Sequence, residues 1–261
     1  MSASTLETTV LHGSGWLEWV DASGVQGQAR RPVPVAALQL RVLRGPADLR
    51  LVPQASGRVV LWRSRPAGLR RSLPGNAAAA DLLPPAEALY VLQGTVADAM
   101  GVFLPRPFNL DAGNGNGHRL RLYRSSHGTA FGPEGGLRGR VRDAAGDALP
   151  WALLQLTVSP PLATPLVYAA QADAAGEFSL ALQRLPMPAP GAAASFPAVL
   201  RARAVAAGSP AVDPDAQPTA RIRTGSAALP RWRNQLDIAI SPGRISALAS
   251  PGQTSLVLQV S

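Results

Sequence analysis

The sequence contains no cysteine and no lysine. Without cysteine, the chain can form neither disulfide bonds nor thiolate metal sites. Without lysine, it cannot supply the phosphate-binding lysine of a P-loop, a pyridoxal Schiff base or a lysine general base. All 25 basic residues are arginines, and with 16 acidic residues they give a formal net charge of +9. Arginine makes two-point contacts with carboxylates and phosphates, so the bias indicates either acidic partners or simply a GC-rich genome.

Long apolar runs are also missing. No stretch of the sequence reaches the roughly 18 apolar residues that a transmembrane helix needs. The first residues lack the basic and apolar regions of a secretory signal peptide, so we expect a cytoplasmic chain. Apolar residues nevertheless make up 46% of the 261 positions, which is enough to bury a substantial core. Glycine and proline, with 25 residues each, suit a fold with many turns.

The sequence offers no recognisable catalytic or metal-binding pattern. His12, His118 and His127 lie far apart, and none belongs to an H-x-x-H or H-E-x-x-H motif. The serine beside His127 would point away from it on a strand, because neighbouring side chains alternate between faces. The glycine-rich run at Gly113–Gly117 lacks G-x-G-x-x-G spacing. We therefore expect no enzyme activity, no cofactor and no metal site.

One pattern, Asp-Ala-x-Gly, occurs four times, and each copy lies between two apolar runs of strand length. Aspartate at the first position of a turn accepts hydrogen bonds from backbone N–H groups two residues on, and glycine supplies positive φ at the end. A calcium loop would instead place carboxylates at alternate positions. The pattern therefore predicts four structural turns, of the kind that closes β-hairpins. The residues are Asp21 and Gly24, Asp98 and Gly101, Asp143 and Gly146, and Asp173 and Gly176.

Alternating apolar and polar residues predict an all-β fold. Every second side chain is apolar in residues 118–124, 201–205 and 236–240, as expected for strands with one buried face. The one tempting helix, at residues 76–83, is ended by Pro84. We expect two small β-sandwich-like modules joined by a connector rich in proline and glycine. The predicted divisions are an N-terminal β module at 1–63, the connector at 64–88, strand pairs around a glycine-asparagine loop at 89–134, and a β-sandwich at 135–261.

Two groups of arginines are candidates for binding a partner, one near the connector and one flanking a tryptophan. Nucleic acid would use such arginines through phosphate contacts. Most arginines of the chain alternate along strands, however, and no nucleic-acid-binding module is recognisable, so we do not expect a nucleic-acid partner. Arginine is also favoured at protein interfaces, and that is the interpretation we prefer. The candidate interface residues are Arg63, Arg65, Arg70, Arg71, Arg231, Trp232 and Arg233.

Two of the predicted turns belong to a longer pattern in residues 137–182. The pattern is G-x-V-x-D-x-x-G-x-P-x-x-x-A-x-V followed by T-D-x-x-G-x-F-x-L. The matching residues are Gly139, Val141, Asp143, Gly146, Pro150, Ala152, Asp173, Gly176, Phe178 and Leu180. The segment resembles a carboxypeptidase regulatory-like domain, although Ala172 replaces the usual threonine and one extra residue precedes Pro150. The resemblance implies a transthyretin-type (prealbumin-like) β-sandwich without catalysis of its own.

A second pattern, V-x-D-x-x-G-x-F-L-P-x-x-F, lies upstream of this segment. It is matched by Val96, Asp98, Gly101, Phe103, Leu104, Pro105 and Phe108. In this order of segments the chain is similar to proteins that accompany phage-tail-like contractile injection systems. The resemblance implies a non-catalytic structural part of such a particle, assembled in the cytoplasm, which docks other subunits through loops, sheet edges and arginines. The alternative is a carbohydrate- or cell-surface-binding sandwich, which Trp16, Trp62 or Trp232 exposed on one flat face would favour.

Overall fold

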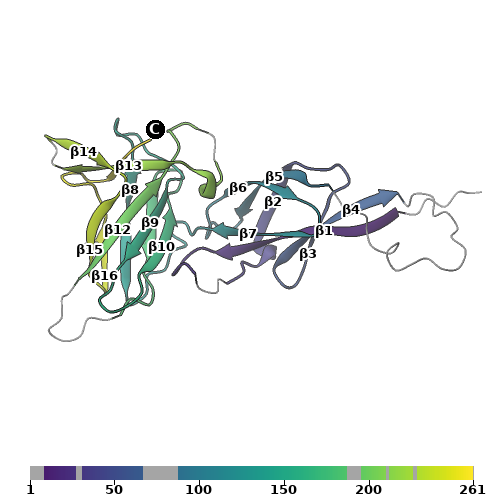
Figure 1. Ribbon diagram of the computed structural model, residues 1–261, viewed down its shortest axis with the longest axis horizontal. Helices are drawn as coiled ribbons and strands as arrows, with labels where there is room; N and C mark the ends of the chain where they lie inside the picture. The colour runs from purple at the N-terminus through teal and green to yellow at the C-terminus, as the bar shows by residue number, and fades with distance from the viewer. Residues whose placement is uncertain are drawn as a thin grey trace, which may run out of the picture.

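The computed structural model describes residues 9–27, 31–66, 88–186, 195–209, 212–225 and 228–260, and these residues are almost entirely β-structure (Figure 1). The prediction of an all-β fold is therefore confirmed. Within this part of the chain, the only helical segments are the short 3-10 helices η1 (Val35–Ala37) and η3 (Pro214–Ala216). The tempting helix at residues 76–83 lies outside the described residues.

The first seven strands form what we call the N-terminal body. They are β1 (Thr9–Asp21), β2 (Leu38–Arg44), β3 (Arg50–Pro53), β4 (Arg58–Pro66), β5 (Tyr90–Asp98), β6 (Arg106–Ala112) and β7 (Asn116–Leu122). One sheet has the order β3-β4-β1-β7 and the other the order β2-β5-β6. Both sheets contribute to a single hydrophobic core, so the N-terminal body is a two-layered sandwich.

The core of the N-terminal body combines strands that are far apart in sequence. Leu17 and Trp19 are fully buried and alternate on β1, as strand periodicity requires. They share the core with residues of β5, β6 and β7, and β1 pairs in parallel with β7. The predicted division between 1–63 and 89–134 therefore does not coincide with a division between cores. β4 before the predicted connector and β5 after it contribute to the same core, and residues 67–87 of the connector lie outside the described part.

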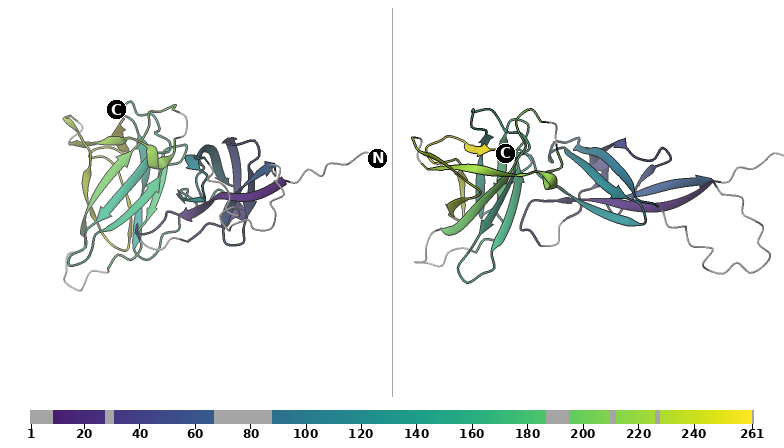
Figure 2. Two further views of the ribbon diagram at one scale, coloured as in Figure 1. Left: turned by 45° about the vertical axis from the view of Figure 1, so that its right-hand side comes forward. Right: turned by 45° about the horizontal axis from the view of Figure 1, so that its top comes forward.

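The remaining strands form the C-terminal body. They are β8 (Gly135–Arg142), β9 (Leu153–Val158), β10 (Leu166–Gln171), β11 (Glu177–Ala181), β12 (Phe196–Arg203), β13 (Thr219–Gly225), β14 (Pro230–Arg233), β15 (Leu236–Ile240), β16 (Arg244–Ala247) and β17 (Leu256–Gln259). Along one edge, β12 pairs first with β15 and then with β13, while β8 pairs first with β16 and then with β17. A second hydrophobic core lies between these strands. Both views of Figure 2 show the two bodies joined end to end in an elongated molecule.

Three of the four Asp-Ala-x-Gly segments form the same hydrogen-bonded turn, beginning at Asp98, Asp143 and Asp173. In each, the carboxylate accepts a hydrogen bond from the backbone N–H two residues on, at 2.9–3.0 Å. The N–H of the glycine donates to the carbonyl of the aspartate, at 3.0–3.2 Å. The three glycines have φ between +67° and +95°, a region that favours glycine over every other residue.

The prediction that these turns close hairpins is right for the Asp98 turn, is right only as a single antiparallel bridge between Arg142 and Ala148 for the Asp143 turn, and is wrong for the strands beside the Asp173 turn. The Asp98 turn connects β5 and β6, which are hydrogen-bonded neighbours. The Asp143 turn leads from β8 to β9 and the Asp173 turn from β10 to β11, and neither pair of strands is hydrogen-bonded as neighbours in a sheet. All three turns have the same hydrogen bonds. Which strand pairs with the strand after each turn depends instead on which side chains that strand buries in the core.

The glycines of the last two turns provide a matched pair of substitutions. Gly146→Ala should destabilise the chain by about 1–2 kcal/mol, because alanine is strained at positive φ. Gly176→Ala should cost more, because its added Cβ would also lie 2.5 Å from the carbonyl oxygen of Val141, whereas nothing lies within 4 Å at Gly146. Urea unfolding followed by tryptophan fluorescence measures both, and equal losses would contradict the difference in crowding.

Candidate functional site: the junction between the two bodies

The chain passes from the N-terminal to the C-terminal body once, through residues 123–134, and this segment is tied to the loop that follows β5. The N–H of Leu104 donates to the carbonyl of Tyr123 at 2.8 Å, and the Ser125 hydroxyl donates to the carbonyl of Gly101 at 2.7 Å. The N–H of Ser125 donates to the carbonyl of Val102 at 2.9 Å. The motif that follows the Asp98 turn thus holds the start of the crossing segment on the N-terminal body.

The loop after β1 makes a second connection, which does not follow the chain. The N–H of Gln26 donates to the carbonyl of Val167 on β10 at 2.7 Å, and Val25 packs against the core of the C-terminal body. Asp21, the last residue of β1, stabilises the bend at which the chain leaves the strand. Its carboxylate accepts hydrogen bonds from the N–H of Ser23 at 2.8 Å and from the side chain of Arg124 at 2.6 Å. The Asp21 segment is therefore a turn that directs the chain towards the other body.

A small apolar cluster lies between the bodies at this point. It contains Ala22 and Tyr123 from the N-terminal side and Leu153 from β9, all less than 8% exposed, with Ala169 of β10 packed against them. Its area is too small to hold two bodies together by the hydrophobic effect alone, which scales with apolar area removed from water. The orientation of the bodies must depend on additional contacts.

A buried arginine supplies these contacts. The side chain of Arg106, at the start of β6, is 3% exposed. Its Nη2 donates to Asp213 at 2.7 Å and to Asp215 at 2.8 Å, and its Nη1 donates to the carbonyl of Arg121. Arg121, on β7, forms an ion pair with the other oxygen of Asp215. Two arginines of one body and two aspartates of the other therefore form a single network, which we call the junction network.

The two aspartates are positioned by the local sequence Asp-Pro-Asp. Asp213 is the N-cap of η3, and its carboxylate accepts from the N–H of Asp215 at 3.0 Å. Pro214 suits the first helical position because its φ is restricted and the first N–H of a helix lacks a partner in any case. The short helix lies on the side of the C-terminal body that faces β6 and β7 (Figure 1), and both carboxylates accept hydrogen bonds from Arg106 of β6.

The electrostatics of the network favour the charged forms of its members. Burial opposes ionisation of Asp215, but the guanidinium groups of Arg106 and Arg121 outweigh it and lower the pKa of that carboxyl. Burial likewise opposes the charge of Arg121, while the electrostatic influence of Tyr123 and Asp215 raises its pKa. Asp215 and Arg121 are therefore both held in their charged forms at neutral pH, and the ion pair between them weakens only as Asp215 becomes protonated in acid.

A buried carboxylate lies inside the N-terminal body. Glu18 is the central residue of a row across three strands, opposite Arg58 on β4 and Arg119 on β7. It accepts hydrogen bonds from these arginines at 3.3 Å and 2.6 Å. Burial opposes its ionisation, but hydrogen bonds from Arg119 and Arg58 dominate and lower its pKa. Arg58 also lies over the ring of Trp16, 4.5 Å from its centroid.

The sequence-predicted interface residues are scattered over the structure. Arg63 lies on β4 and forms an ion pair with Asp48 at 2.8 Å. Arg231 and Arg233 are exposed on β14, with the half-buried Trp232 between them. Arg70 and Arg71, and the side chain of Arg65, lie outside the described residues. Of the described residues, Arg63 is not brought together with Arg231 and Arg233, because it belongs to the other body.

Sequence reasoning missed the arginines that form the junction network. Arg106 stands in the pattern Leu-Pro-Arg-Pro-Phe, where its neighbours suggest only a turn leading into a strand. Arg121 follows the alternation that normally marks a solvated face. The signal that could have found them is the Asp-Pro-Asp sequence, whose two acids stand in a chain with few acids and a large excess of arginine.

The three tryptophans that were candidates for binding sugar lie in two different bodies. Trp16 on β1 and Trp62 on β4 belong to the N-terminal body and Trp232 on β14 to the C-terminal body, so the three do not share one flat face. Among the described residues, no three His, Asp or Glu side chains are grouped so that they could hold a metal ion. The same part of the chain contains no helix long and apolar enough to cross a membrane.

Comparison with known proteins adds little to this geometry. No protein-family model matches the chain, and no significant match is found among curated proteins. Among solved structures, the Bacillus anthracis TIE protein is 11% identical with a TM-score of 0.25, over 95% of this chain and 40% of that one. A leucine-rich repeat protein from Bacteroides thetaiotaomicron VPI-5482 is 9% identical with a TM-score of 0.21, over 94% of this chain and 27% of that one. The chain thus spans less than half the length of either protein, and these low scores do not show a shared fold.

Replacing Arg106 should have a much larger effect than replacing an exposed arginine. Arg106→Met should destabilise the chain by about 1–3 kcal/mol, because two partly exposed carboxylates lose the hydrogen bonds of their buried partner, although Asp215 keeps Arg121. Arg140→Gln is the control: its ion pair with Glu177 is exposed, and its loss should cost less than about 1 kcal/mol. Urea unfolding at neutral pH measures both, and similar losses would contradict the role given to Arg106.

Glu18 should make stability depend on pH in the acid range. Because its pKa is lowered in the folded chain, its contribution is complete above the ordinary value of 4.5 and is lost as the pH falls through the lower folded value. Glu18→Gln should therefore be less stable at neutral pH and should lose less stability on acidification below about pH 4.5. Thermal unfolding at a series of pH values tests this, and parallel curves for the two proteins would refute it.

Proposed function

We propose that this chain is a non-catalytic structural subunit of a phage-tail-like contractile particle, in which it holds neighbouring subunits at a defined distance. The observation that carries the proposal is the junction network, which joins two β-bodies end to end through charged contacts. A subunit that sets the spacing between its neighbours needs a rigid connection of this kind between its two bodies. Domains joined through a small interface otherwise move relative to each other.

Open strands support docking through sheet edges. β14 pairs with β13 alone and β16 with β8 alone, so each leaves one edge without a partner strand among the described residues. All four residues of β16 are exposed, including Ile245 at 51%. Such an edge can accept a strand from another protein, since its N–H and C=O groups are already aligned. Arg231 and Arg233 on β14 would meet carboxylates beside it.

The motif that resembles contractile-system proteins supports the proposal in another way. Its residues are structural: Val96 and Phe108 are buried in the core of the N-terminal body, and Asp98 and Gly101 form a turn. The following loop holds the crossing segment through backbone groups. A pattern of this kind specifies how two bodies are joined, which is what a family of assembly proteins would share.

The direct test is the composition of the particle. Tail-like particles purified from cells that produce this chain should contain it in constant ratio to the tube and sheath proteins, as measured by quantitative mass spectrometry. An Ile245→Pro variant should fold, because position 245 is exposed on an edge strand where proline is tolerated, but should be recovered in the particle at a reduced ratio. Absence of the unchanged chain from intact particles would refute the proposal.

A further inference from the structure

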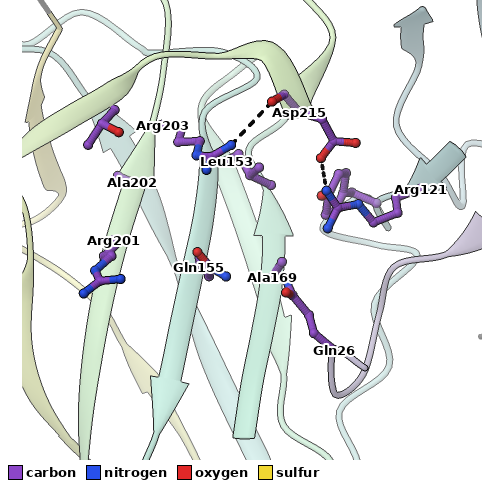
Figure 3. A pocket seen from close by; sticks show the side chains of 11 residues that line it. Gln26, Arg121, Leu153, Gln155, Ala169, Arg201, Ala202, Arg203 and Asp215 are labelled. Atoms are coloured by element: carbon purple, nitrogen blue, oxygen red, sulfur yellow. Dashed lines mark hydrogen bonds and ion pairs between the residues drawn. The ribbon is translucent and has the colours of Figure 1, made fainter. Parts of the chain in front are cut away.

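A cavity of about 270 Å³ lies beside the junction network and is lined by residues of both bodies (Figure 3). Its floor is the outer face of β9, β10 and β12, and its wall is formed by the loop after β1, by β7 and by η3. The polar side chains that line it are Gln26, Arg121, Tyr123, Gln155, Arg201, Arg203, Asp215 and Thr219. We call it the junction cavity.

The charges of the junction cavity do not balance. Three guanidinium groups line it, against the one carboxylate of Asp215. That carboxylate is already shared, because one oxygen pairs with Arg106 and the other with Arg121. Among the described residues, the remaining two arginines have only long contacts with neutral oxygens: Arg203 with the carbonyl of Asp215 at 3.4 Å and Arg201 with the side chain of Gln235 at 3.5 Å.

Neither Arg201 nor Arg203 forms an ion pair with a described carboxylate, and both are exposed. They lie two residues apart on β12, so they point to the same face, with about 7 Å between their Cα atoms. Figure 3 shows Arg201 beside Gln155, its register partner on β9, with Ala169 of β10 next in the row. Two guanidinium groups and an amide donor therefore stand along one side of a concave surface.

The size of the cavity limits its ligand. Pockets that enclose drug-sized molecules measure about 300–1,000 Å³, so about 270 Å³ suits one or two small acidic groups. Carboxylates fit the donor set, because arginine binds them with paired N–H groups. Acidic residues at alternate positions of an extended peptide present carboxylates with the same spacing as Arg201 and Arg203, since both follow the two-residue period of a strand.

We propose that the junction cavity binds two carboxylates of an extended acidic segment of a neighbouring protein, with Arg201 and Arg203 as the principal contacts and Gln155 as a further donor. The identity of that protein as a neighbour rests on the proposed function, whereas the carboxylate specificity rests on the cavity alone. Occupation of the cavity would place a partner against both bodies at once, next to the junction network.

The test uses the purified chain and a synthetic peptide in which glutamate alternates with serine, with a glutamine-for-glutamate peptide as control. Calorimetry at low salt should detect binding of the glutamate peptide alone, with NMR shifts at Gln155 and Ala169 of the cavity floor. The double variant R201Q/R203Q should weaken binding at least tenfold. The double variant R41Q/R221Q removes the same charge from exposed strand positions outside the cavity and outside the open edges of β14 and β16, and should change the affinity less than about twofold.

Three results would overturn the inference. If both double variants weakened binding of the glutamate peptide equally, the peptide would be attracted only by the net positive charge of the chain. Tighter binding of inorganic phosphate than of the peptide would contradict carboxylate specificity, and binding of free glutarate as tight as the peptide would contradict a peptide segment as the ligand. None of these measurements depends on whether the chain belongs to a contractile particle, so failure here and failure of the proposed function are distinguishable.

Discussion

The arrangement of this molecule depends on one buried guanidinium group. Arg106 lies at the start of β6 with its side chain 3% exposed, and it holds two aspartates that the C-terminal body presents on a single short helix. Burying this charge without partners would cost several kcal/mol, so the bodies are most stable in the arrangement that brings Asp213 and Asp215 to it. The ion pairs of Arg106 are directional and therefore fix the orientation of the two bodies, which the small apolar cluster around Tyr123 could not fix alone.

The same constraint places the surfaces through which the chain would work. With the bodies held end to end, the open edges of β14 and β16 lie at the end of the C-terminal body away from β1 and β4 (Figure 1), and the junction cavity opens beside the junction network. A partner in the cavity would contact both bodies, because Gln26 and Arg121 come from one and Arg201 and Arg203 from the other. Binding there would therefore depend on, and reinforce, the arrangement that Arg106 imposes.

Local patterns predicted local structure well. Aspartate and glycine specify a turn within four residues, and the turns at Asp98, Asp143 and Asp173 have the expected hydrogen bonds. The pairing of strands was less predictable, because two of these turns connect strands that are not hydrogen-bonded neighbours, and β1 pairs with β7, whose partner residues lie 101 positions away. Arg106 could not be recognised because a buried and a solvated arginine look alike in sequence, and its partners lie 107 and 109 positions away.

Because the chain has no cysteine, two spin labels can be placed without background. Labels at Ser56→Cys in the N-terminal body and Thr164→Cys in the C-terminal body, both exposed loop positions, report the distance between bodies by pulsed electron paramagnetic resonance. A junction braced by Arg106 predicts one narrow distance distribution, which broadens when Arg106→Met is added. A broad distribution in the chain with an intact junction, unaltered by that substitution, would contradict the central role of the buried ion pairs.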